Sequence, residues 1–70
     1  MYRIEAETVD GKSYWYGQPW EENGIMFETM NDADSRAEGL WIRHTNSLSG
    51  IYARFSVIDQ DGNTISDWEL

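Results

Sequence analysis

The stretch YRIEAETVDGKSYWY, residues 2–16, decides the fold because it has the pattern of a β-hairpin. Ile4 and Ala6 alternate with charged residues, which is the period-two pattern of a strand with one buried face. Asp10-Gly11 then supplies two residues that tolerate positive φ in a two-residue turn. The chain is therefore predicted to return as a second strand through residues 12–16.

The turn also predicts which side chains of this hairpin face the core. A two-residue loop at Asp10-Gly11 pairs Val9 with Lys12, and hence Ala6 with Trp15. Trp15 is then predicted to lie on the apolar face. The opposite face is predicted to carry two tyrosines and two glutamates, namely Tyr14, Tyr16, Glu5 and Glu7.

A connection and a short strand are expected next. GQPWEENG, residues 17–24, is predicted to be a loop because its glycines, Pro19 and Asn23 interrupt any period. Trp20 lies on this loop. IMFET, residues 25–29, predicts a third strand with Phe27 facing inward.

Residues 31–45 have helical spacing. Asn31 or Asp32 is predicted to cap the helix, and Gly39 is a small residue that would let it approach its neighbour. Residues 46–50 are predicted to end it. The apolar stripe that should lie on the sheet comprises Ala33, Ala37, Leu40, Trp41 and His44.

A second hairpin follows, with Asp61-Gly62 as its turn. Pairing Gln60 with Asn63 sets Phe55 against Trp68 on the core face and Ile58 against Ile65 outside. The inward side chains of residues 51–58 are predicted to be Ile51, Ala53, Phe55 and Val57.

These elements predict one α+β domain over residues 1–70. Its expected order is β-β-β-α-β-β, an antiparallel sheet of four to five strands with one helix packed on one face.

Composition narrows the classes of partner. The net charge of −8, from 13 acidic and 5 basic residues, repels nucleic-acid phosphates and anionic membranes and favours a protein with a basic surface. No apolar run approaches the roughly 20 residues of a membrane span, and no secretion-signal pattern opens the chain. A cytoplasmic protein is therefore expected.

The sequence predicts no enzyme, metal site or cofactor. The lone His44 is interpreted as a packed helix-end residue rather than a general base, although its pKa range would suit either role. DQDGN, residues 59–63, has calcium-loop character, but alignment on Gly62 puts Val57 and Trp68 at the first and last ligand positions.

The expected partner-binding residues combine aromatic anchors with steering carboxylates. They are Glu5, Glu7, Tyr14, Tyr16, Trp20, Glu21 and Glu22. Two alternatives stay open. The same aromatic residues would suit a carbohydrate-binding module, and an outer face with Ile58, Ile65 and Tyr52 would suit a homodimer.

FETMNDADSRAEGLW followed by YARFSVIDQDGNTI resembles, within residues 27–65, a layout of small phage-encoded domains: strand, capped helix, then a hairpin closed by D-G-N. Anti-CRISPR proteins and other phage inhibitors of host defence are often acidic single domains of this size. The resemblance implies an inhibitor in the host cytoplasm that occupies a basic, nucleic-acid-facing site, its carboxylates replacing phosphates. It transfers no functional residues to this chain.

Overall fold

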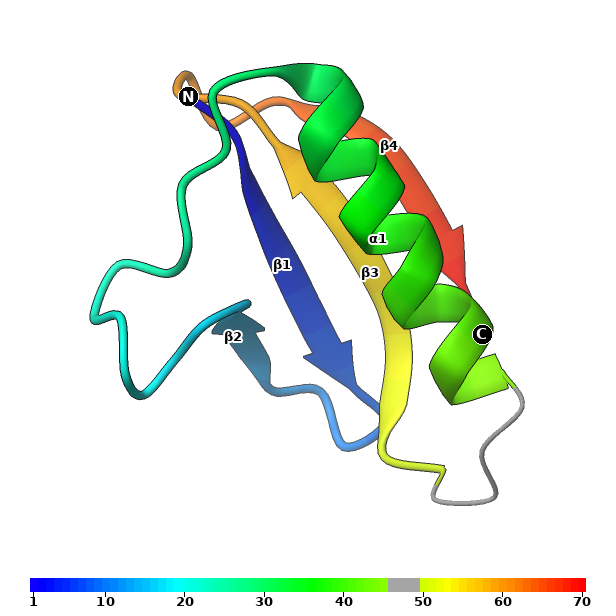
Figure 1. Ribbon diagram of the computed structural model, residues 1–70. Coiled ribbons are helices and arrows are strands. Elements are labelled where there is room, and N and C mark those ends of the chain that lie inside the picture. The colour runs from blue at the N-terminus through cyan, green and yellow to red at the C-terminus, as the bar shows by residue number, and fades with distance from the viewer. Residues whose placement is uncertain (46–49) are drawn as a thin grey trace.

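One antiparallel sheet with a single helix across it makes up the fold in the computed structural model, which describes residues 1–45 and 50–70 (Figure 1). The four strands lie in the order β2-β1-β3-β4. The predicted α+β class is confirmed, with a strand count of four. The elements are β1 (Arg3–Thr8), β2 (Ser13–Trp15), α1 (Met30–Thr45), β3 (Tyr52–Ile58) and β4 (Thr64–Glu69).

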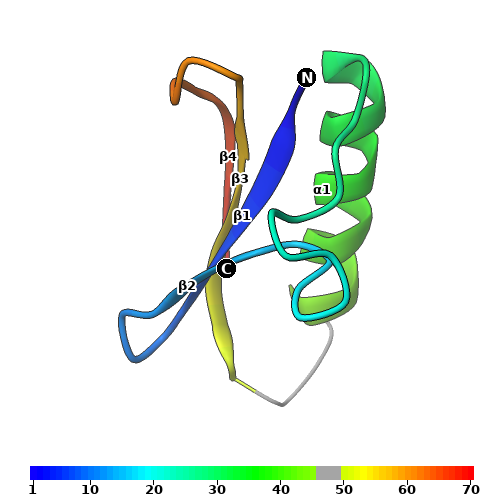
Figure 2. The same cartoon turned by 90° about the vertical axis from the view of Figure 1, so that its left-hand side faces the viewer.

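The core forms where α1 lies on the sheet. Ala33 and Ala37 of the helix are fully buried, and these small side chains let α1 lie close over β3 and β4. The predicted helix stripe is therefore confirmed. Figure 2 shows the whole helix on one side of the sheet. The sheet contributes Ile4, Ala6, Phe55 and Val57 to the same cluster.

The first hairpin has a longer loop than predicted. The Thr8 amide donates to the Lys12 carbonyl over 2.8 Å, so the loop contains three residues, Val9 to Gly11. Gly11 has φ +88°, and in the described part of the chain no residue other than glycine has positive φ. A two-residue type I′ turn needs positive φ at both positions, which Asp10 does not adopt. The Thr8 hydroxyl also accepts from the Lys12 amide over 3.1 Å, which favours this closure.

The longer loop shifts the register by one residue and reverses the predicted faces. Glu5 lies opposite Trp15, and Ala6 lies opposite Tyr14. Since a one-residue shift moves every side chain to the other face, Trp15 points away from the helix. Tyr14 and Tyr16 instead lie on the helix side. The predicted core position of Trp15 is wrong.

The second hairpin keeps its predicted register along most of its length. Phe55 pairs with Trp68, which packs against the core as predicted. The Asp59 amide donates to the Asn63 carbonyl over 3.0 Å, so this loop also has three residues, and Gly62 has φ +85°. The longer loop does not change the pairing of Phe55 with Trp68, because the register shifts between Val57 and Ile58. Ile58 pairs with Thr64 rather than with Ile65.

Two further expectations are corrected near the helix start. Residues 25–29 do not form a strand: Phe27 makes an isolated antiparallel bridge with Tyr2. Phe27 does pack inward against the core. The cap is Thr29 rather than Asn31 or Asp32, since its hydroxyl accepts from the Asp32 amide over 3.1 Å. The predicted helix end at 46–50 lies largely outside the described residues.

The start of β3 also differs from the predicted alternation. Ile51 is 53 % exposed, whereas Tyr52 packs against the core. The β1–β3 register shifts where Thr8 pairs with Tyr52, which makes Ala53 an extra residue in β3 and turns Tyr52 to the helix side. At Gly39, an added Cβ would meet no described atom within 4 Å, so this glycine is not needed for close helix packing.

Candidate binding groove

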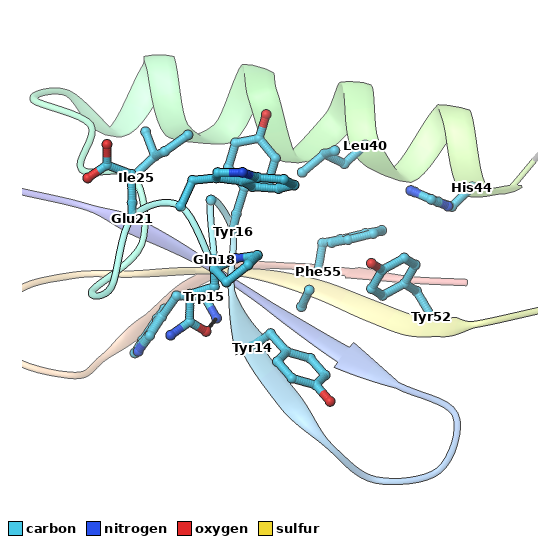
Figure 3. A pocket seen from close by; sticks show the side chains of 14 residues that line it. Tyr14, Trp15, Tyr16, Gln18, Glu21, Ile25, Leu40, His44, Tyr52 and Phe55 are labelled. Atoms are coloured by element: carbon cyan, nitrogen blue, oxygen red, sulfur yellow. Dashed lines mark hydrogen bonds between the residues drawn. The ribbon is translucent and has the colours of Figure 1, made fainter.

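The helix leaves part of its own side of the sheet uncovered. Because α1 lies over β3 and β4 and does not reach β2, a groove of about 1030 Å³ remains beside it. We call this the aromatic groove (Figure 3). Its volume is at the upper end of typical ligand pockets. The residues that line it are Ala6, Tyr14, Trp15, Tyr16, Gly17, Gln18, Pro19, Trp20, Glu21, Ile25, Leu40, His44, Tyr52 and Phe55.

Residues from the helix, three strands and one loop line the aromatic groove, with Ala6 on β1 and Tyr14 on β2. Leu40 and His44 reach it from the helix, and Tyr52 and Phe55 reach it from β3 (Figure 3). The loop after β2 supplies a further wall, and it lies on the helix side of the sheet (Figure 2). The groove therefore depends on the tertiary arrangement of segments far apart in the chain.

The loop that carries Trp20 is held by hydrogen bonds at several points. The Gln18 side chain accepts from the Trp15 amide over 2.9 Å and donates to the Glu22 carbonyl over 2.8 Å. The Ile25 amide donates to the Tyr16 carbonyl over 2.7 Å. Trp20 is 88 % exposed on this support. A large apolar side chain is thus presented to solvent by an ordered loop.

Two glycines allow close contacts in the loop after β2, one of them with β2 itself. Gly24 has φ +81°, and a Cβ added there would lie 2.6 Å from Cβ of Trp15. Gly17 has φ +110°, and its added Cβ would lie 2.6 Å from Cγ1 of Ile25. Both positions combine a left-handed backbone with close contact, so glycine is required for this loop conformation.

Tyr16 is held firmly at the groove wall. Its ring stacks on Phe27 with centroids 6.5 Å apart. The Arg36 guanidinium donates to the Tyr16 hydroxyl over 3.1 Å and lies 5.9 Å from the ring centroid. Tyr14, in contrast, is 48 % exposed. One tyrosine therefore shapes the groove while the other remains accessible.

His44 packs at the far end of the groove. Its ring meets Tyr52 edge-on at 4.7 Å and Phe55 at 5.5 Å. Its Nδ1 is buried without a hydrogen-bond partner among residues 1–45 and 50–70. The contacts are those of a packed residue near a helix end.

The predicted binding residues do not form one surface. Tyr14, Tyr16, Trp20 and Glu21 line the aromatic groove. Glu5 and Glu7 lie on the opposite face of the sheet, because their cross-strand neighbours are Trp15 and Ser13. Glu22 belongs to the loop but does not line the groove. The one-residue error in register had placed the tyrosines beside the glutamates.

Several groove residues were missed because they were assigned only to the core. Leu40, His44 and Phe55 do pack there, but each also borders the uncovered part of the sheet. Their helical or alternating spacing gave no signal for this second role. The extent of the helix over the sheet decides it.

The outer face of the sheet carries paired charges. Arg54 forms ion pairs with Asp67, at 3.7 Å, and with Glu69. The Arg3 guanidinium lies 3.8 Å from the ring centroid of Trp15. The expected homodimer patch is not assembled there, because Tyr52 packs on the helix side and Ile58 is only 8 % exposed.

Within the described residues, no group of three or more histidine or acidic side chains is placed to hold a metal ion. No helix in the same part of the chain is long and apolar enough to cross a membrane. No protein-family model, curated protein or solved structure matches this chain.

Proposed function

We propose that this chain is a protein-recognition module that binds a partner protein through the aromatic groove. The observation that carries the proposal is Trp20, 88 % exposed on a hydrogen-bonded loop beside an open groove lined by aromatic rings. Exposed Trp and Tyr concentrate binding energy at protein interfaces. An ordered loop also limits the entropy lost on binding.

The net charge indicates the kind of partner. A charge of −8 attracts a basic protein surface and accelerates its association. The proposal includes the inhibitor role that the resemblance implies, in which the partner is a host nucleic-acid-binding protein in the cytoplasm. Because acidic residues occur on both faces of the sheet, the charge acts as a general steering field, and the aromatic groove supplies the anchor.

The test starts with affinity capture from a nuclease-treated bacterial lysate at low salt, followed by affinity measurement with the purified partner. Trp20→Ala is expected to weaken binding by about tenfold or more. Glu7→Gln, on the opposite face, is the control and should change affinity by less than about threefold. A partner that binds both variants with native affinity would contradict the proposed groove.

Carbohydrate binding is the second candidate, favoured by the exposed rings of Tyr14 and Trp20. Aromatic faces stack on the apolar faces of sugars, and a neutral glycan is insensitive to the charge of the chain. Titration with neutral oligosaccharides separates the two candidates. Saturable, salt-independent binding that is lost in Trp20→Ala would favour the glycan and displace the protein partner.

A further inference from the structure

The aromatic groove has the electrostatic character of a cation site. Its lining contains one carboxylate, Glu21, and among the described residues no lysine or arginine lines it. The rings of Tyr14, Trp20 and Tyr52 also line it. The face of an aromatic ring carries the negative side of its quadrupole. A cation entering the groove would meet aromatic rings and, among the described residues, no lysine or arginine, while the Glu21 carboxylate lies at the outer end of the groove (Figure 3).

The protein already uses its own aromatic rings in this way. Arg3 lies 3.8 Å from the centroid of Trp15 on the outer face. Arg36 combines a ring contact with a hydrogen bond to the Tyr16 hydroxyl outside the groove. Trp20 carries no such internal cation among the described residues. Its exposed ring is therefore available to a guanidinium from another molecule.

We propose that the aromatic groove binds an arginine side chain of the partner protein. The guanidinium stacks on Trp20, its charge is balanced by Glu21, and its aliphatic stem lies along the apolar part of the groove near Leu40. Arginine fits better than lysine because its planar, weakly hydrated head stacks on rings and pairs with a carboxylate. This inference rests on the proposed function and specifies the chemistry of its partner.

The test uses short acetylated and amidated Gly-X-Gly peptides, in which X is arginine, citrulline, lysine or norleucine. Citrulline is the matched probe because it has the shape of arginine without its charge. Binding to the full ¹⁵N-labelled chain is followed by the indole NH resonance of Trp20. The arginine peptide is expected to bind at least about threefold more tightly than each of the others.

Neighbouring glutamates provide matched variants. Glu21→Gln and Glu22→Gln remove the same charge from adjacent positions, but only Glu21 lines the groove. Glu21→Gln should lower the affinity for the arginine peptide by at least about threefold and leave the affinity for the citrulline peptide unchanged. Glu22→Gln should lower the affinity for the arginine peptide by less than about 1.5-fold. Trp20→Ala removes the indole reporter, so its binding is followed by the backbone amides of Glu21, Leu40 and His44, whose peptide-induced shifts should be abolished.

Equal affinity for arginine and citrulline, or for arginine and lysine, would overturn the inference, as would equal effects of the two glutamate variants. Absence of any peptide binding would overturn it too. In that case partner capture that still depends on Trp20 would leave the proposed function standing. Conversely, if the arginine peptide binds while the captured partner is indifferent to Trp20→Ala, the arginine site stands and the proposed function falls.

Discussion

Single residues control the shape of the loop beside the groove. Gly24 is pressed against Trp15 with positive φ, whereas Gly39 lies in a helix with no described atom near its added Cβ. The same substitution to alanine should therefore have opposite effects on stability at the two glycines.

The turn residue Asp59 acts through hydrogen bonds rather than through close packing.

Gly24→Ala is expected to destabilise the fold by about 1–3 kcal/mol, because alanine disfavours φ +81° and its Cβ would lie 2.6 Å from Trp15. Gly39→Ala should stabilise it by about 0.5–1 kcal/mol through higher helix propensity. Urea denaturation of both variants measures these differences. A stabilised Gly24→Ala protein would contradict the loop conformation described here.

The pH dependence of the β3–β4 turn provides a second prediction. The backbone amide of Asn63 donates to the Asp59 carboxylate and, with further hydrogen bonds, lowers its pKa below the usual 3.8. Because the pKa is lowered in the folded protein, the charged carboxylate of Asp59 stabilises the fold at pH values above the usual pKa. This contribution to stability is lost as the pH falls through the lowered pKa. Asp59→Ala should therefore lower the melting temperature at pH 7.

The difference in melting temperature between the native protein and Asp59→Ala should shrink below about pH 4. Calorimetry from pH 2 to pH 7 measures it. Asp61→Ala is the control, since its side chain makes none of the described turn bonds. A difference independent of pH would rule out the proposed role of the Asp59 charge.

At the scale of elements, both edges of the sheet are partly closed by side chains. On the outer edge of β2, the Trp15 amide donates to the side-chain carbonyl of Gln18. The backbone amide of Gln18 in turn donates to the carbonyl of Trp15. Trp41 donates from its indole to the carbonyl of Glu69 over 2.6 Å, on the outer edge of β4. These contacts reduce the backbone available for strand addition by another chain. The proposed recognition through the aromatic groove is thus distinct from strand addition.

Gln18→Ala should open the β2 edge and loosen the wall that carries Trp20. The loss of the side-chain hydrogen bonds to Trp15 and Glu22 is expected to cost about 1–2 kcal/mol. Hydrogen exchange of the Trp15 amide should accelerate, while amides in the middle of β3 should change only with global stability. Unchanged exchange at Trp15 would show that Gln18 does not hold the loop.

The helix start offers a direct comparison between the structure and the sequence prediction. Thr29→Ala removes the observed cap and should destabilise the fold by about 0.5–2 kcal/mol. Asn31→Ala should be neutral or slightly stabilising, because Asn31 already lies inside α1. Thermal denaturation of the two variants distinguishes them, and a larger loss for Asn31→Ala would contradict the observed cap.

At the scale of the whole molecule, the core and the proposed recognition site lie in different parts of one helix–sheet unit. The core lies beneath the first three turns of α1, whereas the groove opens beside the helix toward β2. Trp20 belongs only to the second part, since it is 88 % exposed. Trp20→Ala should therefore change the free energy of unfolding by less than about 0.5 kcal/mol while weakening partner binding. Parallel urea denaturation and binding titrations check this separation.

The sequence by itself determined the α+β class, the strands β1, β3 and β4, the helix stripe and most of the second hairpin. Alternating and helical periodicities identify those elements because each buries one continuous face. Ala37, Phe55 and Trp68 accordingly lie where their spacing predicts. The loop position of Trp20 was also predicted, since residues 17–24 are rich in residues that interrupt regular structure, but its exposure is decided by the tertiary structure.

Only the tertiary structure decided the register of β2 and thus the composition of the groove. Asp10-Gly11 is compatible with loops of two or three residues, and local sequence does not distinguish them strongly. The hydrogen bonds of Thr8 and the contact of Gly24 with Trp15 favour the longer loop. Because strand side chains alternate with a period of two, that single residue turns Tyr14 and Tyr16 toward the helix and Trp15 away from it.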